Sequence, residues 1–186
     1  MAGSPTNPDG SARGRHWSYA IYEVFKAQRI TLVSFVPDAG HIQLIELCQA
    51  DPHVQAVSLT TEEEGVALAA GAYLGGQRAA LLMQSSGVGN CVNMLSLIKI
   101  CAFPFLTLIT MRGEWGEFNP WQVPMGQSTP AVLAASGVLV ERVSTPQEVR
   151  VTVEAAVQIA FGSYCAVAVL LSQRLIGAKS FGPVKE

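Results

Sequence analysis

The chain has 186 residues, of which 49% are hydrophobic and 14% charged, and its net charge is -2. This length fits one domain, and the small net charge gives no reason to expect nucleic acid or an anionic membrane surface as a partner. The mean hydropathy of +0.32 is high for a soluble protein of this size. Either a membrane or a large protein interface must therefore hide the excess apolar surface.

The longest apolar run, residues 91–111, is the best candidate for a membrane-spanning helix, and it does not qualify. It contains Asn93, Lys99 and Pro104, whereas a spanning helix needs about 20 apolar residues without such interruptions. Residues 1–14 are rich in Gly, Ser and Pro and lack the apolar stretch of a signal peptide, so we expect a disordered tail there. We expect one folded domain over residues 15–175 and a second tail over residues 176–186.

The four cysteines show no C-x-x-C spacing, and the three histidines are scattered along the chain. Buried free thiols in a reducing compartment are more common than disulfides or zinc in such a sequence, which predicts a cytoplasmic protein without its own metal site.

Helices and strands alternate along the whole chain. Hydrophobic periodicity predicts helices over residues 16–28, 42–50, 62–74, 91–100, 130–136 and 146–161, and strands over residues 31–36, 54–59, 78–83, 104–110, 138–140 and 166–171. Most strands are apolar without polar alternation, as in a parallel sheet covered on both faces. The prediction is an open, doubly wound α/β domain with six strands. Residues 111–129 form a long Gly- and Pro-rich connection, and we expect residues 111–127 to be mobile and to order over a substrate.

Sites in such folds lie at the carboxyl ends of the strands. The three loops with this position are residues 37–41, 60–64 and 84–90. The last is rich in glycine, but it matches neither common phosphate-binding motif and has no Lys or Arg nearby, so a tight turn packed against a partner is the favoured interpretation.

The loop over residues 60–64 ends in three acids, Glu62, Glu63 and Glu64, and small apolar residues follow as far as Gly71. Such a helix lets another backbone come close, so a carboxylate at its start would face a crowded, dry place and could exchange a proton near neutrality. Acids at helix N-termini are also commonly solvated, and that interpretation stays open.

At this point the residues resemble a family. Glu63 with the small residues that follow it is similar to the catalytic-glutamate helix of thiamine-diphosphate-dependent decarboxylases, and in that register Glu62 and Glu64 do not fit. Residues 83–90, Met-Gln-Ser-Ser-Gly-Val-Gly-Asn, resemble the M-Q-N-S-G-x-G-N segment of sulfopyruvate and phosphonopyruvate decarboxylases. Further similar pieces lie within residues 30–171: Asn93 and Leu95, Val36-Pro37-Asp38, Arg112-Gly113, Pro124-Met125-Gly126 and Thr129-Pro130.

The resemblance covers the pyrimidine-binding domain alone, since the G-D-G motif of the diphosphate-binding domain is missing from the sequence. It implies an α subunit that shares thiamine diphosphate with a β subunit, which binds the Mg²⁺ ion. Pairing of two α chains through the helices at 62–74 and 91–100 is also expected. The implied residues are Glu63 as the catalytic group; Glu63, Pro37, Gly87, Gly89 and Asn90 around the cofactor; and Asp38, His41, Gln84, Ser85 and Arg112 as candidates for the substrate.

The implied reaction is decarboxylation of a small anionic 2-oxo acid, with 3-sulfopyruvate ahead of phosphonopyruvate. Ser85 stands where the similar proteins often have Asn, which leaves the substrate open. A related carboligase subunit is an alternative, and a non-catalytic scaffold that kept the fold is an alternative of another class.

Overall fold

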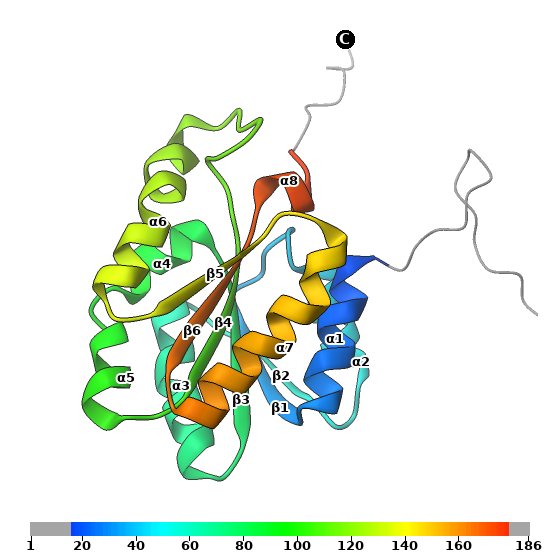
Figure 1. The fold of residues 1–186 in the computed structure, drawn as a ribbon, viewed down its shortest axis with the longest axis vertical. Helices are drawn as coiled ribbons and strands as arrows, with labels where there is room; N and C mark the ends of the chain where they lie inside the picture. The colour runs from blue at the N-terminus through cyan, green and yellow to red at the C-terminus, as the bar shows by residue number, and fades with distance from the viewer. Residues whose placement is uncertain (1–15, 179–186) are drawn as a thin grey trace, which may run out of the picture.

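The computed structural model describes residues 16–178. The predicted tail over residues 1–14 and all but the start of the tail over residues 176–186 lie outside these residues. The centre of the molecule is a six-stranded sheet in the order β2-β1-β3-β4-β6-β5 (Figure 1). All neighbouring strands are parallel. The strands are β1 Ile30–Phe35, β2 Gln55–Ser58, β3 Arg78–Gln84, β4 Phe105–Thr110, β5 Leu139–Val143 and β6 Ala166–Leu171.

Helices cover both faces of the sheet, which confirms the predicted doubly wound α/β fold (Figure 1). One face carries α1 Trp17–Ala27, α2 Ile42–Ala50 and α7 Pro146–Ser163. The other carries α3 Glu62–Leu74, α4 Ser85–Cys91, α5 Leu95–Cys101 and α6 Val123–Ala135. Two short helices, η1 Pro120–Gln122 and α8 Gln173–Ile176, lie beyond the carboxyl ends of β4 and β6.

The strands divide their side chains between two cores because successive residues of a strand point to opposite faces. In β3, Ala80 and Leu82 join the core under α1 and α7. Leu81 and Met83 join the core under α3 to α6. The apolar strand runs in the sequence therefore reflect burial on both sides of the sheet.

The glycine-rich segment differs from its prediction, because residues 85–91 form the helix α4 and not a loop. Glycines weaken a helix in isolation, so the sequence favoured a turn. In the fold α4 packs against both α3 and α6, and this tertiary packing outweighs the propensity.

Helix α6 also differs, since it begins at Val123 and contains Pro130, where the sequence predicted a helix start. A proline cannot donate the helical backbone hydrogen bond. Here the hydroxyl of Ser128 donates to the carbonyl of Pro124 at 2.9 Å, and that of Thr129 donates to the carbonyl of Met125 at 2.7 Å. These bonds support the turn that precedes the proline.

No helix within residues 16–178 is long and apolar enough to cross a membrane. All four cysteines are free, as expected, but the expected burial holds for Cys48 and Cys91 and not for Cys101, which is exposed. Burial raises the pKa of the Cys48 and Cys91 thiols to about 12.

Candidate active site

The carboxyl ends of three neighbouring strands bring together Asp38 after β1, Ser85 after β3 and Arg112 after β4. The Thr110 hydroxyl donates a hydrogen bond to Asp38 Oδ2 at 2.6 Å, and the backbone N–H of Arg112 donates to Ser85 Oγ at 3.1 Å. A pocket of 230 Å³ opens here, lined by Asp38, Thr110, Arg112 and the end of α8. It collects two of the five predicted substrate residues.

His41 lies beneath this edge and does not line the pocket. Its ring is buried, and Nε2 donates to the carbonyl oxygen of Leu108 at 3.1 Å. Nδ1 has no hydrogen-bond partner among residues 16–178. Burial lowers the pKa of His41, although nearby Asp38 acts in the opposite direction. His41 is therefore a neutral side chain under the pocket and not a cation that faces a substrate.

The guanidinium of Arg112 is already paired with Glu117. Arg112 Nε and Nη2 donate to the two oxygens of that carboxylate at 2.6 and 2.7 Å, and the two side chains are only 10% and 4% exposed. These hydrogen bonds hold the pKa of Glu117 far below its usual range. The positive charge of Arg112 is thus balanced before any ligand arrives.

The acidic cluster at the start of α3 places its three carboxylates differently. Glu62 is 8% exposed, and its Oε2 accepts a hydrogen bond from Asn90 Nδ2 at 2.7 Å. Glu64 accepts from the backbone N–H of Thr60 at 2.9 Å and so supports the start of the helix. Glu63 is exposed.

Within this chain Glu62 is the buried member of the cluster, and the prediction that Glu63 is the catalytic group remains a prediction. The reason for the burial of Glu62 is the register of α3. Residues three, four and seven positions along a helix share one side. Glu62 is followed at these positions by Gly65, Val66 and Ala69, which are all buried, whereas Glu63 is followed by buried Val66, exposed Ala67 and half-buried Ala70.

Gly87 makes the space that the Glu62 carboxyl group occupies. A Cβ at this position would lie 2.5 Å from Glu62 Oε1 and from Glu62 Cδ. Gly89, further along α4, faces the thioether of Met125. Of the three predicted cofactor residues on α4, Gly87 and Asn90 therefore contact Glu62, whereas Gly89 faces α6.

The remaining predicted residues lie further from this arrangement. Pro37 is exposed in the loop after β1. The Gln84 amide donates to Ser86 Oγ at 2.8 Å and to Gln122 Oε1 at 3.2 Å, so it links α4 to η1.

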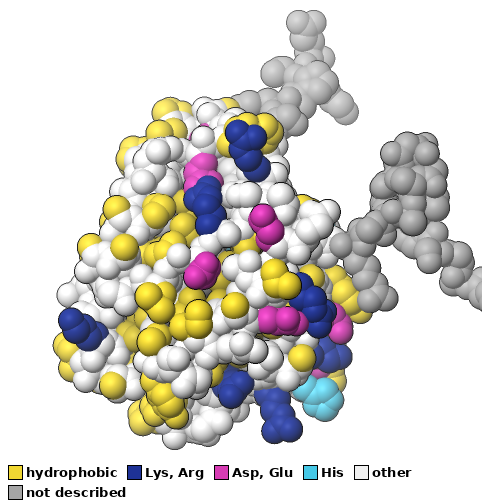
Figure 2. All heavy atoms as spheres, in the orientation of Figure 1, with side chains coloured by type: hydrophobic (Ala, Val, Ile, Leu, Met, Phe, Trp, Pro, Cys, Tyr) yellow, Lys and Arg dark blue, Asp and Glu magenta, His cyan; other side chains and the backbone are white. Residues whose placement is uncertain are grey.

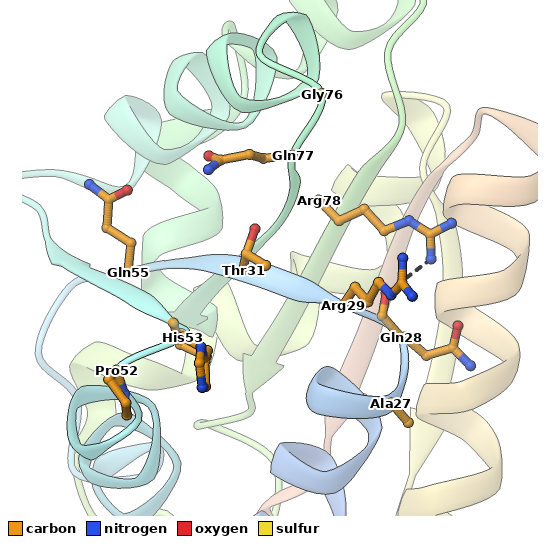
Figure 3. Close-up of a pocket in the computed structure, with 11 residues that line it drawn as sticks. Ala27, Gln28, Arg29, Thr31, Pro52, His53, Gln55, Gly76, Gln77 and Arg78 are labelled. Carbon is orange, nitrogen blue, oxygen red and sulfur yellow. Dashed lines mark hydrogen bonds between the residues drawn. The ribbon is translucent and has the colours of Figure 1, made fainter.

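A cavity of 890 Å³ lies at the opposite edge of the sheet, where β1 and β3 begin (Figure 3). Arg29, His53 and Arg78 line it, and Arg78 donates to the carbonyl of Gln28 at 3.0 Å. None of the predicted site residues lies there. We place the candidate site at the carboxyl edge, where a buried carboxylate and the helix α4 meet.

No family model matches the chain. The chain is 37% identical to the sulfopyruvate decarboxylase subunit alpha of Methanothermobacter thermautotrophicus over 155 residues. These residues make up 83% of this chain and 94% of that relative. The chain belongs to the sulfopyruvate decarboxylase alpha-subunit family. This confirms the resemblance found in the sequence.

Longer relatives match over a smaller part of their length. A sulfopyruvate decarboxylase of Methanosarcina acetivorans is 33% identical over 63% of this chain and 30% of its own. A phosphonopyruvate decarboxylase of Streptomyces viridochromogenes is 37% identical over 56% of this chain and 27% of its own. Among solved structures, a 2-oxoglutarate:ferredoxin oxidoreductase from Magnetococcus marinus aligns with a TM-score of 0.72 at 15% identity, over 87% of this chain and 29% of that one. It shows the fold alone.

Several residues at the carboxyl edge of the sheet were not predicted from the sequence of this chain. Thr110 could have been found as a polar residue that ends an apolar strand beside the Arg112-Gly113 pair. Glu117 and Gln173 carry no such signal, since each acts through a contact with a distant part of the chain. Within residues 16–178, no three His, Cys, Asp or Glu side chains are grouped so that they could hold a metal ion.

Proposed function

We propose that this chain is the α subunit of a thiamine-diphosphate-dependent decarboxylase that converts 3-sulfopyruvate to sulfoacetaldehyde and CO₂. Membership of the alpha-subunit family supports this function. The structural observation that carries it is the Glu62 carboxyl group, buried between α3 and α4 at the carboxyl edge of the sheet.

The residues around Glu62 fit the aminopyrimidine of this cofactor. Asn90 donates to Oε2, and Oε1 has no hydrogen-bond donor among residues 16–178. Gly87 packs against Oε1, since a Cβ there would lie 2.5 Å from it. When bound, thiamine diphosphate supplies an electron sink for the electron pair left when CO₂ departs. Glu62 would share a proton with N1′ of the pyrimidine, with Asn90 as its positioning residue.

Glu63 is the competing assignment. The sequence register selects it, and its exposure means that it could reach a cofactor only outside the surface of this chain, for example across a subunit interface. The burial of Glu62 and its hydrogen bond from Asn90 favour Glu62, because both hold its carboxyl group in one place within this chain. Gly87, Gly89 and Pro37 complete the proposed cofactor side.

The substrate side of the proposal is the 230 Å³ pocket with Asp38, Thr110 and Arg112. Ser85, at the start of α4, accepts a hydrogen bond from the backbone N–H of Arg112. His41 donates to the carbonyl of Leu108 beneath the pocket, and Gln84 donates to Ser86 on α4. Glu117 balances Arg112 and Asp38 adds a negative charge, so the described residues that line this pocket offer no unpaired positive charge to an anionic substrate.

The names of the alpha-subunit relatives imply a partner subunit, and we propose that it is a β subunit that holds the diphosphate and Mg²⁺. We propose in addition that α chains pair through α3 and α5, where Leu74 and Ile100 are exposed. Phosphonopyruvate is the second candidate substrate, because phosphonopyruvate decarboxylases are also among the relatives. A carboligase subunit and a non-catalytic scaffold are the remaining alternatives.

The test replaces each acid by glutamine in the reconstituted α/β complex. Glu62→Gln should lower turnover of 3-sulfopyruvate by about 10²–10⁴-fold, the usual span for a positioned acid–base group. Exchange of the thiazolium C2 proton with D₂O should slow in step. Glu63→Gln and Glu64→Gln should stay within a few-fold of the wild type. Loss in Glu63→Gln alone would support the sequence register, and full activity of all three variants would overturn the thiamine assignment.

A further inference from the structure

The segment between β4 and α6 has an ordered backbone. The Glu117 carboxylate accepts from the backbone N–H groups of Gly113 at 3.1 Å and Asn119 at 3.0 Å, in addition to Arg112. The side chain of Gln173 donates to the same carboxylate at 2.9 Å. One buried carboxylate therefore joins the two ends of residues 113–119 to the edge of the sheet.

A second set of contacts holds the outer part of this segment. Gln173 Oε1 accepts from the backbone N–H groups of Glu114 and Trp115, both at 3.0 Å. Glu114 pairs with Arg142 of β5 at 2.6 Å. The segment stands at the carboxyl edge beside α8, at the top of the view in Figure 1.

Three aromatic side chains of this segment are exposed in part, with Arg174 over the Trp115 ring at 5.3 Å and Arg112 over the Phe118 ring at 6.0 Å. Trp115 is 45% exposed, Phe118 43% and Trp121 84%. The Asn119 side chain accepts from the backbone N–H of Trp121 at 3.1 Å, which fixes the start of η1. An apolar hollow of 530 Å³ is lined by Pro120, Trp121, Pro124 and Met125. Exposed tryptophans on a backbone that is already ordered are typical of the energetic centre of a protein interface, since binding then costs little conformational entropy.

The aromatic surface, formed by Trp115, Phe118, Trp121 and Met125, adjoins the candidate active site. Met125 of the hollow lies over Gly89 of α4, and Gln122 accepts a hydrogen bond from Gln84 at the start of that helix. Hydrophobic side chains also spread over the side of the molecule that carries α5 and α6 (Figure 2). A chain that completes the site must therefore pass close to Trp121.

The lengths of the relatives indicate which chain this is. The longer sulfopyruvate decarboxylase of M. acetivorans has about 70% of its length outside the match, whereas the alpha-subunit relative is covered over 94%. In the two-subunit proteins, the missing part must lie on another polypeptide. We propose that the aromatic surface formed by Trp115, Phe118, Trp121 and Met125 is the docking site of the β subunit. This inference rests on the proposed function, and it assigns the surface of the subunit contact and not the reaction.

The test measures binding of the purified β subunit by sedimentation velocity and calorimetry, without any assay of activity. Trp121→Ala should weaken binding by about 30-fold or more, the effect expected of a central interface residue. The control is Val151→Ala on α7, which removes an apolar side chain that is 62% exposed on the other face of the sheet. It should bind as the wild type does. Thermal unfolding should be unchanged in both variants, because both side chains are largely exposed.

Three outcomes would overturn the docking site. Trp121→Ala could bind the β subunit with unchanged affinity. It could instead abolish self-association of the α chain while β binding persists, which would make a second copy the occupant. The wild-type chain could also fail to bind any β subunit, which would remove the two-subunit function as well. A complex that forms through Trp121 but does not decarboxylate 3-sulfopyruvate would contradict the proposed function and support the docking site.

Discussion

Glu62 and Gly87 form the contact on which the proposed chemistry depends. The carboxyl group of one side chain fills the space that the other residue leaves empty, and Asn90 holds one of its oxygens. Glu62 lies on α3 and Gly87 on α4, so their contact depends on how these two helices pack together.

Gly87→Ala is expected to move the Glu62 carboxyl group without unfolding the protein, because the side chain it meets is flexible. Turnover of the reconstituted complex should fall by about 10²-fold, as for a catalytic group displaced by about 1 Å. Gly162→Ala is the matched control, since α7 is remote from the site and a Cβ there meets nothing within 4 Å. A fully active Gly87→Ala complex would argue against a role for the buried carboxylate.

The Arg112–Glu117 ion pair leads to a second prediction about a single residue. Glu117→Gln leaves the Arg112 charge unpaired in a site with little solvent, so the free energy of unfolding at pH 7 should fall by about 3 kcal/mol. Glu154→Gln is the control, because its pair with Arg150 is exposed and is worth at most about 0.5 kcal/mol.

The Glu117 effect should depend on pH. Pairing lowers the pKa of Glu117 below the ordinary value of 4.5, so the unfolded chain takes up the proton first on acidification. The stabilisation is therefore complete above about pH 4.5 and declines as the pH falls further. Urea unfolding should show a smaller difference between the wild type and Glu117→Gln at pH 3 than at pH 7. If the free energies of unfolding differ equally at both pH values, the ion pair is not the source of the difference between the wild type and Glu117→Gln.

At the scale of the elements, the sequence predicted α2, α3 and β6 with their observed bounds. It did not predict α4 or the first turns of α6, because glycine and proline normally end helices and the compensating contacts come from distant residues. The acidic cluster was predicted as the site, but the choice among its three members depends on which side of α3 meets α4, and the sequence does not contain that information.

The predicted mobility of residues 111–127 without a partner can be tested in the segment after β4. Its sequence predicts a mobile loop, whereas the hydrogen bonds of Glu117 and Gln173 would hold its backbone in place. The amides of Gly113, Trp115 and Asn119 should therefore exchange slowly with D₂O in the α chain alone, as measured by NMR. Exchange at the rate of an unstructured peptide would support the mobile loop.

In the whole molecule, the chain provides one part of the proposed active site. The fold supplies a buried carboxylate, a small polar pocket and an exposed aromatic surface at one edge of the sheet. The longer relatives carry most of their length outside the region that this chain matches. Catalysis is therefore expected only from the assembled α/β complex.

The most direct test of this account is release of CO₂ from 3-sulfopyruvate, measured for the α chain, the β subunit and their complex, each with thiamine diphosphate and Mg²⁺. The account predicts turnover by the complex and none by either chain alone, with phosphonopyruvate as the comparison substrate. Turnover by the purified α chain alone would contradict the division of the site between two subunits. A complex that forms but releases no CO₂ from 3-sulfopyruvate would contradict the proposed reaction.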